Sequence, residues 1–201
     1  YSVYWSKPKT FDVRTDYAFK RVFGGEHSKD ILLSFLNALI RFPKGAEIID
    51  LYIVDPQQIP MLMGMKDTYV DVKAILSDKT QVIIEMQVLN VEGFEKRILY
   101  NVAKSYSMQL SEGEHYHLLN PVIALTITDF TLFPESTKVV SCYKLLEKDD
   151  FIVYSDDCEL IFIELPKFNK TVDELQSITD KWIFFLKEAG RLDAVPQRFN
   201  E

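Results

Sequence analysis

A nearly continuous apolar run from Pro121 to Ile127 is the feature that most restricts how this chain can fold. Successive side chains of a β-strand point to opposite faces of its sheet, so a strand without polar alternation has to be covered on both faces. Strands of this kind occur in sheets that lie between layers of helices. The run therefore predicts an α/β fold.

The remaining hydrophobic pattern supplies helices and strands around this run. Apolar residues recur at helical spacing in some segments, and β-branched and apolar residues concentrate in others. The predicted helices span 15–23, 28–41, 92–112 and 172–189, and the further predicted strands span 47–55, 68–76, 81–89, 138–146 and 159–165. We predict one domain over residues 1–201, in which a mixed central sheet is flanked by helices, with a core of about 12–130 and a C-terminal extension of about 138–190.

Charge and hydropathy narrow the classes of function. The formal net charge of -7 argues against a protein that coats nucleic acid electrostatically. The charge is uneven, because residues 1–44 hold 8 lysines and arginines against 4 acidic residues, whereas residues 112–201 hold 9 against 17. A phosphate-facing surface should therefore draw on the N-terminal part. No apolar run approaches the roughly 20 residues of a membrane helix, and no signal-peptide pattern opens the sequence, so we predict a cytoplasmic protein with no membrane partner.

Two neighbouring predicted strands carry the residues that suggest chemistry. Glu85 and Gln87 share one strand face, because side chains two apart point the same way. If the turn before them consists of Ser77-Asp78-Lys79, Asp71 on the preceding strand lies directly opposite Glu85. Like charges so placed destabilise a hairpin by up to about 1 kcal/mol, so a bound cation, a shared proton or a nearby base has to offset them. Mg²⁺ is the natural candidate, since it binds one or two carboxylates together with phosphate oxygens and water.

This arrangement resembles the signature of the PD-(D/E)XK nuclease superfamily, in which an Asp begins one strand and a Glu and a polar residue follow on the next. More narrowly, the chain resembles the family of recombination-promoting nucleases and transposases. The matching segments are Asp16-Tyr17-Ala18-Phe19-Lys20 with Phe23-Gly24, Phe35-Leu36-Asn37, Asp71-Val72, Ile84-Glu85-Met86-Gln87, Phe94-x-x-Arg97-x-x-Tyr100, Gly113-x-x-Tyr116, Leu165-Pro166-Lys167-Phe168 and the helix around Trp182.

The resemblance implies a restriction-endonuclease-like core and Mg²⁺-dependent cleavage of DNA, with Mn²⁺ as a substitute ion. It implies that Asp71 and Glu85 are metal ligands, with the Met86 carbonyl as a third candidate, and that Gln87 occupies the position of the family's lysine. Gln87 can orient water or phosphate but brings no positive charge and no titratable proton. DNA is the implied partner, and a homodimer is left open.

A basic residue from elsewhere is expected to supply the missing charge. Lys20, Lys66, Lys73 and Arg97 are the candidates, since each could face phosphate oxygens. Lys20 could equally pair with Asp16 at i, i+4 on a helix surface, and Arg97 with Tyr100 could be an ordinary solvated helix edge rather than a substrate contact.

Two other functions stay open on the sequence. The acidic balance and the missing lysine favour an interaction domain on a degenerate nuclease fold. Two carboxylates and a metal ion would also suit a phosphodiesterase with a substrate other than DNA, because they do not by themselves select nucleic acid.

Overall fold

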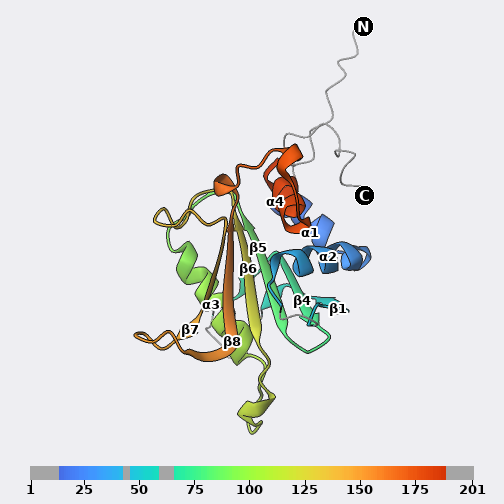
Figure 1. The fold of residues 1–201 in the computed structure, drawn as a ribbon. Helices are drawn as coiled ribbons and strands as arrows, with labels where there is room; N and C mark the ends of the chain where they lie inside the picture. Colours follow the sequence, from blue (N-terminus) through green and yellow to red (C-terminus); the bar gives the residue numbers. More distant parts are fainter. Residues whose placement is uncertain (1–13, 43–45, 59–65, 189–201) are drawn as a thin grey trace.

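The computed structural model describes residues 14–42, 46–58 and 66–188, and its centre is a six-stranded sheet (Figure 1). The strand order is β1-β4-β5-β6-β8-β7, in which β5, β6 and β8 run parallel and the other pairs are antiparallel. The bounds are β1 Leu51–Val54, β4 Val72–Leu76, β5 Gln81–Gln87, β6 Val122–Thr128, β7 Val140–Leu146 and β8 Val153–Glu164, and a separate ribbon pairs β2 Gln57–Gln58 with β3 Thr68–Tyr69. The predicted mixed α/β sheet is confirmed.

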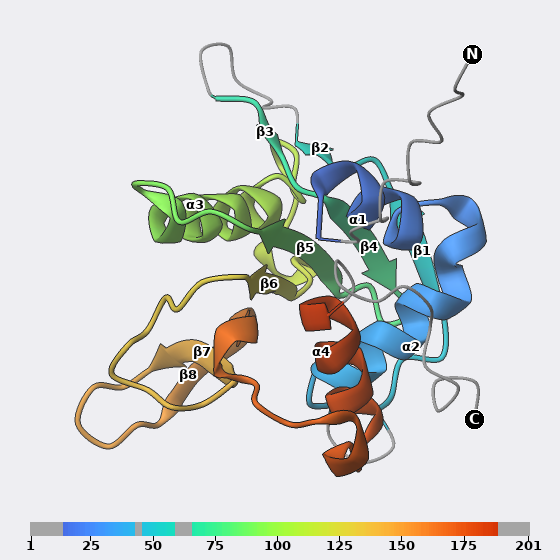
Figure 2. The ribbon, with the colours of Figure 1, turned by 90° about the horizontal axis from the view of Figure 1, so that it is seen from above.

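Helices cover both faces of the sheet, as the apolar run of β6 requires. On one face lie α1 Asp16–Phe23, α2 Lys29–Leu39 and α4 Ile178–Glu188, and on the other lies α3 Phe94–Ser107 (Figure 2). All seven residues of β6 are buried between these layers. Short 3-10 turns complete the fold at Glu26–Ser28, Tyr116–Leu118, Leu165–Lys167 and Val172–Glu174.

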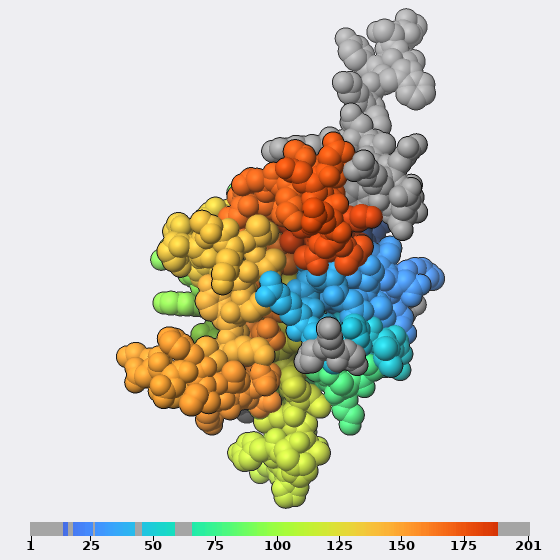
Figure 3. Space-filling model, in the orientation of Figure 1, coloured from blue at the N-terminus to red at the C-terminus, as the bar shows by residue number. Residues whose placement is uncertain are grey.

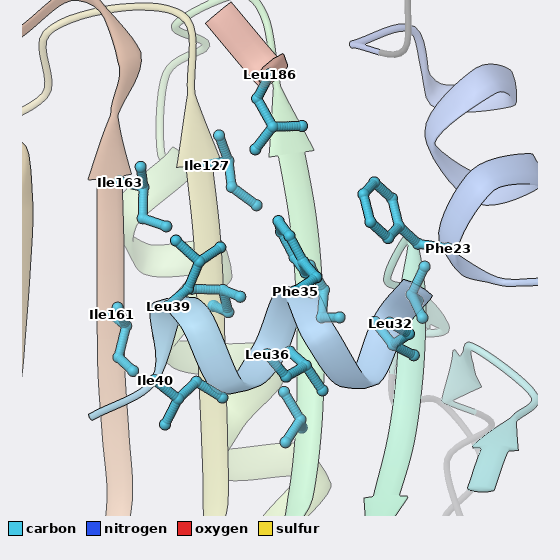
Figure 4. Close-up of a cluster of buried hydrophobic side chains, with 14 of the residues drawn as sticks. Phe23, Leu32, Phe35, Leu36, Leu39, Ile40, Ile127, Ile161, Ile163 and Leu186 are labelled. Atoms are coloured by element: carbon cyan, nitrogen blue, oxygen red, sulfur yellow. The ribbon is translucent and has the colours of Figure 1, made fainter. Parts of the chain in front are cut away.

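The larger apolar layer forms where α2 lies across the sheet. Phe35, Leu36 and Leu39 are almost fully buried against strand residues that include Ile161 and Ile163 (Figure 4). Burying each side chain of this kind contributes about 1.5–3 kcal/mol. Residues 138–188 therefore belong to the same sheet and core as the preceding part, since β8 and α4 both contribute to this layer.

The hairpin of β4 and β5 has the register expected from a three-residue turn. Val72 pairs with Ile84, and the Leu76 amide donates to the Thr80 carbonyl at 2.9 Å. Lys79 takes the left-handed conformation at φ 72°, which closes such a turn and is more often occupied by glycine. The hairpin therefore has the Ser77-Asp78-Lys79 turn that the sequence analysis gave as a condition.

The predicted strand 68–76 is wrong in one respect, because it is interrupted at Val70 and Asp71. The Val70 amide turns away to the Pro56 carbonyl (3.3 Å), whereas the Met86 amide donates to Asp71 Oδ2 (2.7 Å). A side-chain carboxylate has taken the place of a backbone acceptor, as short acidic side chains do at strand ends. Beyond this break the chain pairs as β3 with β2.

Two predicted helices are shorter in the structure. α3 ends at Ser107 rather than at 112, because the Gln109 side chain bonds the backbone of Asn120 at both its N–H (2.9 Å) and its carbonyl (2.8 Å) and so turns the chain toward β6. α4 begins at Ile178 rather than at 172, because the Ser177 hydroxyl accepts from the Asp180 amide (3.0 Å) and caps the helix there.

The β7–β8 hairpin extends beyond the rest of the sheet, and its tip projects from the body of the molecule (Figure 3). Large side chains are exposed along this tip, including Phe151 at 71% and Tyr154 at 85%. In the described part of the chain, no helix is both long and apolar enough to cross a bilayer.

Candidate active site

Asp71 lies at the start of β4, where the hairpin ladder breaks. Its side chain is mostly buried, at 15% exposure, and its Oδ2 accepts the Met86 amide at 2.7 Å. Its other oxygen, Oδ1, lies 3.6 Å from Lys20 Nζ of helix α1. The carboxylate is therefore fixed on one side by the neighbouring strand and faced on the other by a cation.

Glu85 lies near the end of β5 and faces helix α3. Only 6% of the residue is exposed, and its carboxylate accepts from Asn101 Nδ2 (2.9 Å) and Arg97 NH2 (3.3 Å). Burial raises the pKa of Glu85, while Arg97, Asn101 and the more distant charge of Lys20 act to lower it. Burial prevails over these partners, so the carboxylate would be stabilised by further positive charge.

Gln87 and Arg97 form a linked pair beside Glu85. The Gln87 amide oxygen accepts from Arg97 NH2 at 2.8 Å, and its Nε2 donates to the Leu89 carbonyl at 2.8 Å. Arg97 thus bridges Glu85 and Gln87 through one nitrogen, while its side chain remains 43% exposed. Gln87 therefore holds the Arg97 guanidinium in place.

The other predicted basic residues have different positions. Lys20 is positioned by helix α1. The Thr15 hydroxyl caps the start of this helix by accepting from the Ala18 amide (3.4 Å). The helix ends at Gly24, where a Cβ atom would lie only 2.8 Å from the Lys20 carbonyl oxygen. The side chain of Asp16, the alternative partner of Lys20, lies outside the described residues. Lys73 is half-buried beside Ile83, and burial lowers its pKa.

Lys66 and Tyr100 line an open groove next to the carboxylates. The groove has a volume of about 740 Å³ and lies between the β3 end of the chain and the first turns of α3, where Arg97 and Asn101 also line it. Lys66, Arg97 and Tyr100 therefore share one surface, and the groove connects that surface with Glu85 through Arg97.

Two polar residues at the site escaped the sequence analysis. Asn101 is 1% exposed and donates to Glu85, and Lys104 is 3% exposed and donates to the backbone carbonyls of Gln58 and Lys66, both at 2.6 Å. The signal was present in the helix period, since Arg97, Asn101 and Lys104 lie at i, i+4 and i+7 and form a polar stripe beside the apolar one. Lys104 fastens the β2–β3 ribbon to α3.

The atoms grouped at this end of the hairpin suit a hard divalent cation. The donors are carboxylate oxygens of Asp71 and Glu85, and oxygen is the ligand that Mg²⁺ takes. Among the residues that the structure describes, no cluster of three or more His, Cys, Asp and Glu could hold a metal ion. Two protein carboxylates, completed by water and substrate oxygens, are typical of Mg²⁺ sites. The residues therefore fit the ion, and a bound cation would stabilise the ionised form of the buried Glu85.

Comparison with known families identifies the family of the chain. Residues 13–201 match the model of the PD-(D/E)XK nuclease family transposase. The chain belongs to this family. The predicted fold class and resemblance are thereby confirmed, and a nuclease-like function with DNA as the substrate class follows from membership.

The PD-(D/E)XK match extends across the break at Asp71 and through β8 and α4, so it covers both the hairpin and the C-terminal part. Nucleases of this group generally use divalent metal ions. Neither a curated protein nor a solved structure gave a match to the chain.

Proposed function

We propose that this PD-(D/E)XK protein is a Mg²⁺-dependent DNA endonuclease that acts in recombination or on mobile DNA. The observation that carries the proposal is that Asp71 and Glu85 lie at the same end of the β4–β5 hairpin, with a cation beside each: Lys20 from α1 and Arg97 from α3. The two helices lie on opposite faces of the sheet, so both layers of the fold contribute a cation to this end of the hairpin.

Asp71 and Glu85 would hold the ion, with the Met86 carbonyl beside them. When bound, Mg²⁺ or Mn²⁺ would polarise the scissile phosphodiester and lower the pKa of the water that attacks phosphorus. Asp71 is kept in position by the Met86 amide, and Glu85 by Asn101. Neither carboxylate then needs to reorganise when substrate arrives, which is what preorganised sites achieve.

Arg97 would supply the positive charge that the family signature takes from lysine. The Gln87 amide oxygen accepts a hydrogen bond from Arg97 NH2. This bond directs the guanidinium toward the end of β5, where a phosphate group would lie beside the carboxylates. An arginine fork can bind two phosphate oxygens but cannot give up a proton at neutral pH. Arg97 would therefore stabilise charge on the phosphate, and Lys20 would act from the other side.

The test is nicking of supercoiled plasmid by the purified protein with Mg²⁺, Mn²⁺ or EDTA. We expect nicking with either metal, none in EDTA, and none from Asp71→Ala or Glu85→Ala. Glu159→Gln is a matched control, because Glu159 is also a partly buried acid whose pKa is raised mainly by burial, but it lies on β8 beside Lys144. The control should nick as the wild type does.

A second candidate function is an inactive nuclease fold that binds DNA or protein, and Gln87 is the observation that favours it. Absence of nicking by folded wild-type protein in every divalent ion would support this candidate, as would DNA binding that survives Glu85→Ala and EDTA. Equal nicking by wild type and Asp71→Ala would contradict the assignment of the carboxylates.

A further inference from the structure

The open groove beside the proposed active site has the lining of a nucleotide-binding surface. Its volume of about 740 Å³ lies within the roughly 300–1,000 Å³ of ordinary ligand pockets. Its two sides come from different elements, one from the residues around β3 and the other from the first turns of α3. The residues that line it are Lys66, Asp67, Thr68, Tyr69, Val91, Glu92, Gly93, Phe94, Lys96, Arg97, Tyr100 and Asn101.

Aromatic and cationic side chains face this groove from both sides. Tyr69 is 61% exposed on one side and Tyr100 is 38% exposed on the other. Lys66, Lys96 and Arg97 supply three positive charges against the negative charges of Asp67 and Glu92, so the lining is net positive on a chain of net charge -7. Exposed aromatic rings interleaved with lysine and arginine are the surface on which unpaired bases stack while cations follow the backbone.

The lining also includes Asn101, whose buried amide provides a hydrogen-bond acceptor. Asn101 gives its Nδ2 to Glu85, which fixes the orientation of the amide, since a carboxylate needs a donor. Within the part of the chain that the structure describes, the other amide atom, Oδ1, is buried and has no hydrogen-bond partner. In a DNA strand only the bases carry N–H donors, because the phosphates and deoxyribose of the backbone offer acceptors alone.

We infer that this groove binds unpaired bases of DNA next to the scissile phosphate, so that the preferred substrate is single-stranded or locally opened DNA. The inference rests on the proposed nuclease function, because Arg97 lines the groove and also contacts Glu85. Stacking on Tyr69 and Tyr100 requires a free base face, and in a duplex both faces of each base are covered by its neighbours. A strand opened at the groove meets that requirement.

Binding separates this inference from its alternatives. The binding experiment uses the Glu85→Gln variant, which keeps an acceptor for Asn101 and should cleave far more slowly than the wild type. A labelled single-stranded oligonucleotide and the duplex of the same sequence are titrated with this variant in Mg²⁺ and followed by fluorescence anisotropy. We expect tighter binding of the single strand. Tyr69→Ala and Tyr100→Ala should each weaken that binding at least about fivefold, the lower end of the loss when one stacking ring is removed.

Matched variants show whether stacking is responsible. Tyr69→Phe and Tyr100→Phe keep the ring and should remain within about twofold of the starting affinity, as should Tyr154→Ala, which removes an exposed tyrosine from the distant β7–β8 tip. Tighter binding of the duplex, or equal affinities of the Ala and Phe variants, would overturn the inference, and tighter binding of RNA of the same sequence would overturn the assignment to DNA.

The proposed function can fail separately. If plasmid nicking requires Asp71 and Glu85 but single-strand binding does not depend on Tyr69 or Tyr100, the nuclease function is supported and the binding role of the groove is contradicted. If single-strand binding depends on the two tyrosines but no divalent ion supports cleavage, the binding role of the groove is supported and the nuclease function is contradicted.

Discussion

Two buried glutamates near the carboxyl ends of parallel strands have contrasting surroundings. Glu164, the last residue of β8, is fully buried and accepts from the Leu132 amide (2.7 Å), the Phe133 amide (3.0 Å) and Lys167 Nζ (2.5 Å). Within the described residues, Glu85 on β5 accepts from the side chains of Asn101 and Arg97, and the Arg97 side chain is 43% exposed.

The difference separates a structural carboxylate from one suited to chemistry. Backbone amides cannot leave Glu164 without unfolding the turn after β6, and the Lys167 side chain is itself only 10% exposed. The Arg97 guanidinium can move toward an incoming phosphate, because the side chain is half-exposed and is held by the side chains of Glu85 and Gln87. Burial raises the pKa of Glu85 more than its partners lower it, so additional positive charge would stabilise the ionised carboxylate.

The largest expected effect is on stability at Glu164. Glu164→Ala would leave the Leu132 and Phe133 amides without their acceptor and would remove the carboxylate partner of the Lys167 ammonium, and breaking a buried pair of this kind costs about 3–5 kcal/mol. Glu85→Ala should cost far less, about 1 kcal/mol, since it also removes an unfavourable buried charge. Urea unfolding of the two variants measures the contrast, and equal losses of stability would remove the distinction drawn between them.

Cleavage should show the opposite order. Glu85→Gln keeps the size and the acceptor of the side chain but removes its charge, so we expect plasmid nicking to fall at least about 100-fold while the fold is retained. Retained activity of Glu85→Gln, in protein whose unfolding midpoint matches that of the wild type, would show that the charge of Glu85 has no role.

Arg97 should have an intermediate effect on cleavage. Arg97→Ala is expected to lower nicking by about 10- to 100-fold, and Arg97→Lys should recover part of the loss, because lysine restores the charge but not the fork that bridges Glu85 and Gln87. Lys148→Ala, which removes an exposed lysine between β7 and β8, controls for a general loss of positive charge. If Lys148→Ala has as large an effect on nicking as Arg97→Ala, Arg97 is not the replacement for the family's lysine.

The smallest expected effect concerns Asp180, a second structural carboxylate. Burial alone would raise the pKa of Asp180, but hydrogen bonds from Lys170 Nζ and from the Gln176 and Ser177 amides lower it below the ordinary value of 3.8. The stability that Asp180 contributes is therefore present at neutral pH and is lost as the pH falls below about 4 through the folded-state value.

Lys170 is half-exposed, so the contribution of Asp180 should be only about 1 kcal/mol. Chemical unfolding of wild type and Asp180→Asn at a series of pH values measures it. The stability difference between the two proteins should be present at pH 7 and shrink in acid, and a difference that grows in acid would contradict the assigned direction of the pKa shift.

The sequence predicted the parts of the fold that local pattern decides. The nearly continuous apolar run of β6 required helices on both faces, and the turn length set the pairing of Val72 with Ile84. The break at Asp71 could not be predicted this way, because it depends on a carboxylate displacing a backbone acceptor at the Met86 amide. Strand periodicity does not report such a competition.

The site was predictable to the same extent. Asp71, Glu85 and Gln87 followed from strand alternation and family resemblance, whereas the choice of Lys20 and Arg97 over Lys73 as the cations nearest the carboxylates needed the packing of two helices on the sheet. Asn101 and Lys104 were missed because polar residues on an apolar helix face are usually taken as its solvated edge. Their catalytic or binding roles, like those of the other site residues, stay predictions.

The central claim, that Asp71 and Glu85 are the metal ligands, is tested most directly by calorimetric titration of the protein with Mn²⁺. The proteins compared are the wild type, Glu85→Gln, the double variant Asp71→Asn/Glu85→Gln and the control Glu159→Gln. We predict saturable Mn²⁺ binding by the wild type and the control, weakened by at least about tenfold in Glu85→Gln and lost in the double variant. Equal Mn²⁺ binding by the wild type and the double variant would contradict the assignment of Asp71 and Glu85 as the metal ligands.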